Sequence, residues 1–457
     1  MRHPDRPASA LVVSDAPAPP TLTARQWLIC GVAALGFAFD LYEMLVLPII
    51  LRPALGALGS LEPGTRDFNR WVGLLFYVPA VVGAAFGLLG GYLTDLVGRR
   101  RVLVWSIVLY SLAALAASQA STLPQLLLFR CATVIGVSVE YVAAVAWLAE
   151  LFTDPKQRQR ALAYTQSAAG LGGLMASGAY YLAVTYAERL PAIHMGHDAW
   201  RYALLFGLAP AIPLLLIRPF LPESASWQAL RAKGRLTRPS FVELFRPALR
   251  QTTVVTTILF ACTYGVASGV LLQTPRMVPG LPELHGVPAR QVEQAVGGVQ
   301  FIAELGVLTG RLLFALLVVR IAGQRRLARL LLVPGLSVFA FVYFFAATHS
   351  LWLLAAGAFF AALLINAPVS LLWSYVPRMY PTHLRGTGEG FVHNIGSRIL
   401  GTLAVVATTQ LANVMPGDGA PARLAYSAAS VAVVLYSIAL IATFALREPA
   451  GDRLPEE

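Results

Sequence analysis

Twelve long apolar segments constrain this chain more than any other feature of its sequence. Each holds roughly 20 residues or more with few charges, which is the length that a helix needs to cross a membrane. The segments are too long for buried strands and lack the two-residue alternation of a membrane β-barrel. We therefore predict helical spans near residues 27–50, 71–93, 102–120, 125–151, 162–187, 200–220, 251–273, 292–318, 328–347, 350–376, 389–413 and 424–446.

The composition agrees with a lipid environment and excludes several classes of protein. Hydrophobic residues make up 57% of the chain and charged residues 13%, a balance that ordinary soluble domains do not show. The three cysteines, Cys30, Cys131 and Cys262, lie in separate apolar segments, so we predict no disulfide framework, no metal site and no cofactor.

The distribution of basic residues predicts the orientation. With the N-terminus inside, about 24 of the 35 Lys and Arg residues fall on the cytoplasmic side and about 8 outside. These residues stand at helix ends and form no continuous patch, so nucleic acid is not an expected partner. Residues 1–26 lack the apolar core of a cleavable signal peptide. We predict a multi-pass protein of the bacterial inner membrane, in contact with its lipids, monomeric and with both termini cytoplasmic.

A polar stretch in the middle divides the chain. Residues 221–250 are rich in Arg, Pro and Ser and read as a cytoplasmic linker between bundles of six spans at 27–220 and 251–446. Cytoplasmic tails at 1–26 and 447–457 complete the predicted organisation. Each half has a basic connection after its second span and another after its fourth, which indicates a weak internal repeat.

The first of these connections carries a recognisable motif. Residues 91–101 read GYLTDLVGRRR, with Gly91, Asp95, Gly98, Arg99 and Arg100. The segment resembles the signature loop of the major facilitator superfamily. The chemistry suits a turn, because glycine permits a tight connection between helices, and a carboxylate and a guanidinium can pair across it.

Three further segments resemble the same superfamily in the same order. The fourth span, from Arg130 through Glu140 to Glu150, is similar to that helix in sugar and organic-acid porters. Residues 221–227, which include Glu223, resemble the sugar-porter motif PESPRW. Residues 380–388, which include Arg385, resemble the loop before the eleventh span.

The resemblance implies an all-α membrane fold of two pseudo-symmetric six-helix bundles that move a small polar solute by alternating access. It also implies a network of cytoplasmic ion pairs that locks the outward-facing state, with candidates Gly91, Asp95, Gly98, Arg99, Arg100, Glu150, Glu223 and Arg385. The corresponding loop of the second half has no acid, so we expect a lopsided lock in which Asp95→Asn impairs transport more than a change of Arg325 or Arg326.

Charges within the spans are the main candidates for function, because a charge at membrane depth costs at least about 2.5 kcal/mol. Asp40 and Glu43 stand three residues apart on one face of the first helix. Helical rise puts Glu43 and Arg130 at similar depths of roughly 8 to 10 Å, so we predict that they pair. Asp40 and Glu140 both fall near the midplane and are the predicted proton-binding acids.

The second half offers a further set of polar side chains. Glu304 and Arg398 also reach midplane depth, so Arg398 is predicted either to pair with Glu304 or to anchor an anionic solute. For Arg311 we favour snorkelling toward the cytoplasm. Uncharged residues that are predicted to line the solute path are Tyr42, Gln166, Tyr264, Gln300 and Asn366, with His393 and Asn394 as additional candidates.

The solute class is left open by two opposing resemblances. The segment Asp40–Glu43 is similar to the acidic pair in the first helix of aromatic-acid:proton symporters, which implies an organic anion carried with protons. The PESPRW-like segment implies sugars or polyols instead. A drug or metabolite efflux antiporter is an alternative, although residues 169–173 lack the proline of its fifth-span motif.

Two other classes of function are weighed against transport. A non-transporting sensor would be expected to carry long cytoplasmic signalling segments, which the short tails do not provide. An enzyme would need a catalytic cluster, and the nearest, His194, His197 and Asp198 in an outer loop, is better explained as solvated polar residues. We therefore predict no enzymatic activity.

Overall fold

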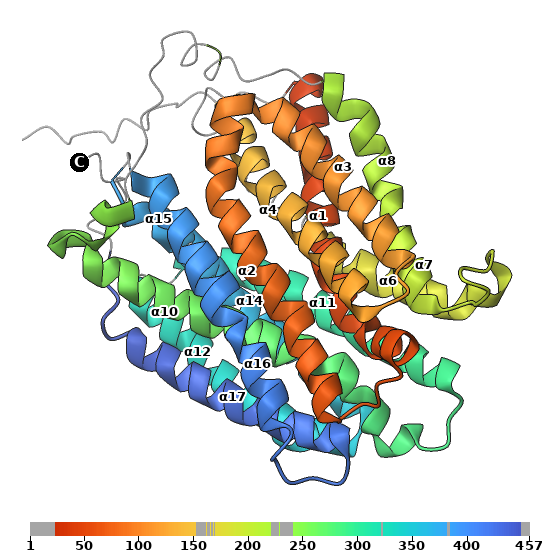
Figure 1. The fold of residues 1–457 in the computed structure, drawn as a ribbon. Coiled ribbons are helices and arrows are strands. Elements are labelled where there is room, and N and C mark those ends of the chain that lie inside the picture. Colours follow the sequence, from red (N-terminus) through yellow and green to blue (C-terminus); the bar gives the residue numbers. More distant parts are fainter. Residues whose placement is uncertain are drawn as a thin grey trace, which may run out of the picture.

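The structure is a computed structural model that describes residues 23–151, 170–220, 241–320, 323–381 and 384–448, together with residues 161, 165, 168 and 228. Within these residues every extended element is a helix, as the sequence predicts. The N-terminal half is drawn in red to yellow-green in Figure 1 and the C-terminal half in green to blue.

The N-terminal half holds six predicted spans. Its helices are α1 (Ala24–Gly59), α2 (Arg66–Val97), α3 (Arg99–Ser118), α4 (Leu123–Leu151), α6 (Leu171–Tyr186), and α7 (Ala199–Phe206) with α8 (Leu208–Ile217), which together form one span broken at Gly207. Short 3₁₀ turns lie at η1 (Ala187–Arg189) and η2 (Arg218–Phe220). Threonine side chains start the first two helices, since Thr23 accepts from the Gln26 amide at 3.3 Å and Thr65 from the Phe68 amide at 3.3 Å.

The C-terminal half repeats this arrangement with more interruptions. Its helices are α10 (Pro247–Gly269), α11 (Ala289–Arg320), α12 (Gln324–Phe341), which continues through the π-turn η7 (Val342–Ala346) into α13 (Ala347–His349), α14 (Leu351–Tyr375), α15 (Arg385–Phe391), the π-helix η10 (Val392–Gly401), α16 (Leu403–Leu411) and α17 (Ala420–Ala442). The 3₁₀ turns are η3 (Phe241–Phe245), η4 (Leu271–Arg276), η5 (Val278–Gly280), η6 (Pro282–Leu284) and η8 (Val376–Arg378). Helix α10 begins inside the predicted linker because Pro247 suits a first helical turn.

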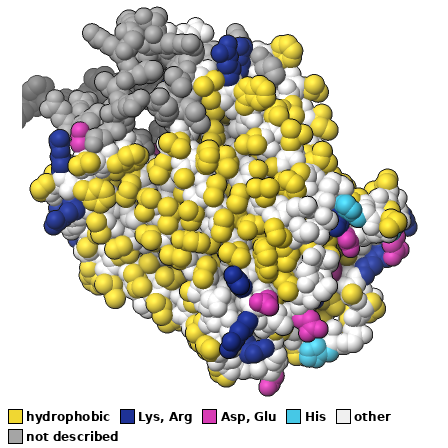
Figure 2. All heavy atoms as spheres, in the orientation of Figure 1, with side chains coloured by type: hydrophobic (Ala, Val, Ile, Leu, Met, Phe, Trp, Pro, Cys, Tyr) yellow, Lys and Arg dark blue, Asp and Glu magenta, His cyan; other side chains and the backbone are white. Residues whose placement is uncertain are grey.

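The described helices include 11 that are long and apolar enough to cross a membrane. The remaining predicted span corresponds to α6, whose predicted start lies outside the described residues. Figure 2 shows hydrophobic side chains covering the middle of one face, with charged and histidine side chains mostly toward its two ends. Trp105, Leu128 and Trp352 are among the exposed large apolar side chains of the spans, which suits contact with lipid.

Small residues allow the closest helix crossings. Gly306 and Gly310 stand four apart on α11, and a Cβ atom added to either would lie 2.2 or 2.3 Å from a backbone oxygen of α14. Without water to drive association, close backbone packing of this kind stabilises helix pairs in membranes. The two halves meet along two lines, where α6 packs against α11 and where α2 packs against η10 and α16.

The two ends of the molecule differ in what they contain. The chain ends described by the structure, near Thr23 and Glu448, lie with the turns at Gly98 and Gly323 at one end, which we call the terminal end (Figure 1). Both glycines have positive φ values, 105° and 91°, as a tight turn between consecutive spans requires. The loops that follow α1 and α16 lie at the opposite end, called the far end.

Candidate functional site

Helices α1 and α4 bury four of the predicted charged residues inside the N-terminal half. The exposed fractions of Asp40, Glu43, Arg130 and Glu140 are between 0 and 5%. Arg130 Nη1 donates to the Glu43 backbone oxygen at 2.8 Å and lies 4.0 Å from Glu43 Oε2. The predicted contact between Glu43 and Arg130 is therefore confirmed.

Glu140 has a partner that the sequence did not indicate. Its Oε1 lies 2.5 Å from Nη1 of Arg218, which follows α8 and is itself only 3% exposed. Gly36 on α1 makes room for this pair, because a Cβ atom there would stand 2.0 Å from Arg218 Nη2. The pair thus joins α4 to the end of the sixth span, and it packs directly against α1.

Asp40 differs from these neighbours because its carboxylate forms no ion pair with a described residue, whereas Glu43 and Glu140 each pair with an arginine. Both oxygens are buried, and neither accepts a hydrogen bond within the described part of the chain. The charged groups close enough to act on it are Glu140, Arg218, Arg398 and Glu43. A buried carboxylate in this position is costly to keep ionised.

Arg398 links the two halves near Asp40. From η10 it donates to the backbone oxygen of Gly83 on α2 at 3.2 Å and to the hydroxyl of Ser138 on α4. The alternative prediction that it pairs with Glu304 is wrong, since Glu304 accepts from Gln300 Nε2 at 2.8 Å instead. The physical reason is that η10 packs on α2, whereas α11 packs on α6 along the other line of contact.

Glu304 itself lies against the N-terminal half. A Cβ atom on Gly173 of α6 would stand 2.0 Å from Glu304 Oε2, so this glycine makes room for the carboxylate. Glu304 Oε2 is buried and accepts no hydrogen bond within the described residues. Each of the two contact lines between the halves therefore holds an ionisable side chain of the C-terminal half, the buried Glu304 on one and the half-buried Arg398 on the other.

An aromatic cluster lies beside Arg398 where the halves meet. The ring of Tyr141, from α4, lies 6.3 Å from Trp373 of α14 and 6.4 Å from His393 of η10. Trp373 Nε1 donates to the hydroxyl of Tyr264 at 3.1 Å. Phe37 contacts Tyr141 edge-on with 5.5 Å between ring centroids. We call Phe37, Tyr141, Tyr264, Trp373 and His393 the aromatic cluster.

Two arginines flank this cluster. Arg311 and Arg398 both lie close enough to Tyr141 and Tyr264 to act on them electrostatically. Arg311 is half-buried, and its favoured interpretation as a snorkelling side chain stays a prediction. Flat aromatic faces beside guanidinium groups suit a planar anion, which can stack on the rings and pair with the cations.

The other predicted lining residues form hydrogen bonds within their own half or lie outside the described residues. Tyr42 donates its hydroxyl to the backbone oxygen of Ala203 within the N-terminal half. Asn366 donates to the Ala362 carbonyl of its own helix at 3.0 Å, and Asn394 to that of Gly390 at 2.9 Å. Gln166 lies outside the described residues.

The predicted gate residues are only partly described. Arg99 is 5% exposed and donates to the backbone oxygen of Thr94 at 3.2 Å, across the turn at Gly98, and Arg100 is half-buried. Glu223 lies outside the described residues, and the surroundings of Gly91 and the side chains of Asp95, Glu150 and Arg385 are not described either. The predicted lock therefore stays a prediction.

At the far end, polar contacts hold the two halves together. Arg52 of α1 pairs with Glu293 of α11, which also accepts the hydroxyl of Tyr180 on α6. Asn69 of α2 donates to Asn413 Oδ1 at 2.7 Å. These contacts join the two halves at the far end.

The residues considered for an enzyme have structural partners. His194 Nε2 lies 2.9 Å from the Gln119 carbonyl, His197 Nδ1 lies 3.0 Å from that of Ala187, and Asp198 pairs with Arg201 at 3.3 Å. These three side chains are therefore accounted for by the loop that they support.

Comparison with known proteins decides the family. A family model described as the Major Facilitator Superfamily matches residues 28–405. The chain belongs to this superfamily. A protein of Cupriavidus pinatubonensis, named "Probable 4-methylmuconolactone transporter", is 27% identical over 419 residues, covering 91% of this chain and 89% of that one. The 4-hydroxybenzoate transporter PcaK of Pseudomonas aeruginosa is 28% identical over 341 residues, covering 69% and 72%.

A solved structure of the same fold supports the assignment. The xylose transporter XylE from E. coli, in a partially occluded inward-open conformation, has a TM-score of 0.71 at 16% identity and covers 94% of this chain and 100% of that one. This likeness shows the major facilitator fold. Since these relatives are transporters, the chain is a membrane transporter of small solutes and not an enzyme.

Three residues of the site were missed by the sequence reasoning. Arg218 lies near the end of the predicted sixth span, with apolar residues and a proline around it, and the sequence analysis assigned it no role. Tyr141, which follows Glu140, and Trp373 were not singled out either. The available signal was a group of aromatic residues at similar depth to the intramembrane charges, in both halves.

Proposed function

We propose that this transporter is a proton-coupled symporter of small organic anions, with an aromatic carboxylate as the preferred class of solute. The observation that carries the proposal is the aromatic cluster with Arg398 and Arg311 beside it, at the junction of the two halves. A bidentate guanidinium contact would hold the carboxylate, and ring stacking would hold the planar body.

The buried acids of the N-terminal half support a role for protons. Glu43 and Glu140 already have arginine partners, which leaves Asp40 as the carboxylate without one. A bound proton would remove the cost of burying its charge. Loss of that proton would leave an anion within reach of Arg218 and Arg398, so proton binding at Asp40 and anion binding at Arg398 would be coupled.

The arrangement of the halves supports alternating access. With the termini in the cytoplasm of a bacterium, as the basic residues indicate, the far end faces outward and its closure corresponds to an inward-facing state. The proposed cytoplasmic lock, with Asp95, Arg99 and Glu150, would then form only when the inner side closes. Loss of the outer contacts would accompany that step.

Solute preference follows partly from the relatives. PcaK is named for 4-hydroxybenzoate, an aromatic carboxylate, and the Cupriavidus protein for 4-methylmuconolactone. Both solutes fit a site built from arginine and flat apolar surfaces better than they fit a site of hydroxyl and amide groups. The segment at 221–227, which resembles a sugar-porter motif, makes xylose the appropriate competing solute.

The test is uptake of labelled 4-hydroxybenzoate, nicotinate and xylose into proteoliposomes with and without an imposed pH gradient. We expect gradient-driven uptake of an aromatic acid, its loss in Arg398→Gln and loss of gradient dependence in Asp40→Asn. Matched controls are Arg70→Gln and Asp67→Asn, which change exposed side chains of α2. Uptake of xylose alone, or unchanged coupling in Asp40→Asn, would contradict the respective part of the proposal.

A further inference from the structure

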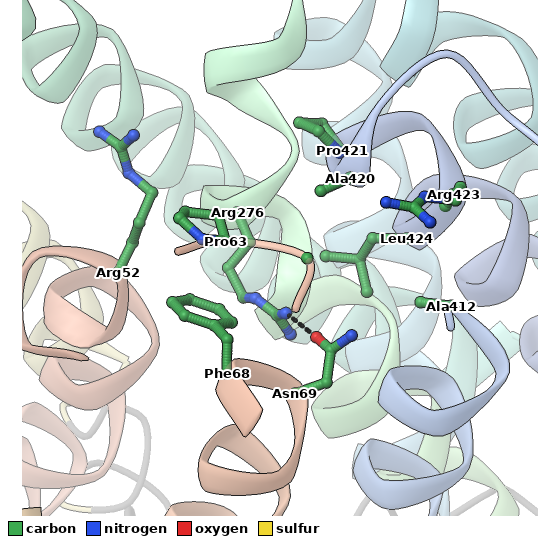
Figure 3. Close-up of a pocket in the computed structure, with 11 residues that line it drawn as sticks. Arg52, Pro63, Phe68, Asn69, Arg276, Ala412, Ala420, Pro421, Arg423 and Leu424 are labelled. Carbon is green, nitrogen blue, oxygen red and sulfur yellow. Dashed lines mark hydrogen bonds between the residues drawn. The ribbon is translucent and has the colours of Figure 1, made fainter. Parts of the chain in front are cut away.

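A small pocket that opens to solvent lies at the far end, away from the aromatic cluster. Its walls come from both halves, since Arg52, Gly64, Phe68 and Asn69 belong to α1, α2 and their loop, whereas Arg276 and Arg423 belong to η4 and α17 (Figure 3).

Arg276 is the buried cation of this pocket. It is 8% exposed and extends toward Asn69, to whose Oδ1 it donates at 2.8 Å (Figure 3). Its other contacts are Gln273 Oε1 at 3.0 Å and the ring of Phe68, 5.2 Å from the guanidinium carbon. These partners are all neutral, and its Nε is buried without a hydrogen-bond acceptor in the described residues.

The pocket therefore has more positive charge than its own acids neutralise. The guanidinium of Arg52 already forms an ion pair with Glu293. Among the described residues, neither Arg276 nor Arg423 has a carboxylate within ion-pair distance. A buried cation without a counter-charge is costly, and an anion in the adjoining space would offset this cost.

From this arrangement we propose that the far-end pocket binds a small oxyanion, held by Arg276 and Arg423. A carboxylate or a phosphate group matches the fork of donors that a guanidinium presents. Gly64 brings the loop after α1 close to the site, because a Cβ atom there would lie 3.6 Å from Arg423 Nη2 and 2.2 Å from the Cβ of Ala420. The anion would contact both halves and stabilise the closed far end.

This site is separate from the proposed solute site and does not depend on which solute is carried. The oxyanion has two possible sources, an inorganic anion such as phosphate or the carboxylate of an organic acid outside the cell. Both share the same chemistry at the pocket, so the experiment uses inorganic phosphate and benzoate as separate probes.

The test is the thermal unfolding midpoint of the purified full chain in detergent, titrated with sodium phosphate or sodium benzoate at constant ionic strength. With at least one probe we expect a saturable upward shift of the unfolding midpoint, both in the unaltered chain and in the control variant Arg70→Gln. The shift should also persist in Arg398→Gln, which removes the arginine of the proposed solute site. In Arg423→Gln, a partly exposed position, the apparent dissociation constant should rise about tenfold or more.

The two probes identify the source of the anion. A shift with phosphate that needs Arg423 indicates an inorganic ligand, and a shift with benzoate that needs Arg423 indicates an organic acid. The proposal is overturned if neither probe shifts the midpoint, if Arg423→Gln leaves the titration unchanged, or if the shift is lost in Arg398→Gln but kept in Arg423→Gln. Failure of 4-hydroxybenzoate uptake would leave this result unaffected.

Discussion

Glu140 and Arg218 form an ion pair of 2.5 Å inside the N-terminal half, and both side chains are almost fully enclosed. Such a pair gives little net stability relative to an apolar contact, but breaking it leaves one charge buried alone. Because the pair lies against Gly36 and within reach of Asp40, it holds a fixed positive charge next to the proposed proton-binding acid.

We predict that Arg218→Gln lowers stability strongly, on the order of 3–5 kcal/mol where the unpaired Glu140 stays ionised. The measurement is the thermal unfolding midpoint in detergent, compared with that of the unaltered chain. The double variant Glu140→Gln with Arg218→Gln serves as the control, since it removes both charges and should recover much of the loss. A double variant that is less stable than Arg218→Gln alone would show that the pairing is not the cause.

Helix positions and one ion pair were predictable from the sequence for simple physical reasons. The length and apolarity of the segments predict the spans, and regular helical rise places Glu43 and Arg130 at equal depth, where the structure shows them in contact. The depth of a residue does not determine the direction in which its side chain points around the helix. For this reason one of the two alternatives predicted for Arg398, a pair with Glu304, was wrong, although both residues were placed inside the membrane.

The terminal end shows a second limit of sequence reasoning. The loop at Gly323 has no acid of its own, yet Glu448 accepts hydrogen bonds from the backbone amides of Gln324 and Arg325, both at 2.9 Å. The acid is supplied by the segment that follows the twelfth span. No local sequence pattern connects Gly323 with Glu448, so the loop was interpreted as having no carboxylate.

The aromatic cluster gives a prediction about solute selection. Trp373→Phe removes the hydrogen bond to Tyr264 but keeps a flat ring, so uptake of 4-hydroxybenzoate should fall only several-fold. Trp373→Ala removes the ring and should reduce uptake much further, mainly through a higher KM. Initial uptake rates at several solute concentrations separate the two effects. Equal kinetic parameters in both variants would place Trp373 outside the solute path.

The contact between Arg52 and Glu293 predicts how the far end opens. Arg52→Gln removes a link between α1 and α11 and leaves Tyr180 as the partner of Glu293 among the described residues, so the closed far end should become less populated. Spin labels at cysteines replacing the exposed Glu62 and Asp418 would report this by pulsed electron spin resonance, with a longer mean distance in Arg52→Gln.

A charge swap provides the control for this measurement. Arg52→Glu combined with Glu293→Arg keeps an ion pair between the same helices and should restore the shorter distance. If Arg52→Gln leaves the distance distribution unchanged, the pair is not what holds the far end closed, and the contact of Asn69 with Asn413 becomes the better explanation.

Glu448 should stabilise the C-terminal half through the first turn of α12. Its carboxylate accepts two backbone amides that have no partner within the helix, and a negative charge at a helix N-terminus is favourable. Glu448→Gln keeps the shape but weakens both effects, so we expect a loss of about 1 kcal/mol, seen as a lower thermal midpoint. Glu62→Gln, which changes an exposed far-end carboxylate, should leave the midpoint unchanged.

Because Glu448 is the acid next to Gly323, Glu448→Gln should also weaken transport more than Arg326→Gln does. The opposite order would show that the cap is not needed for transport.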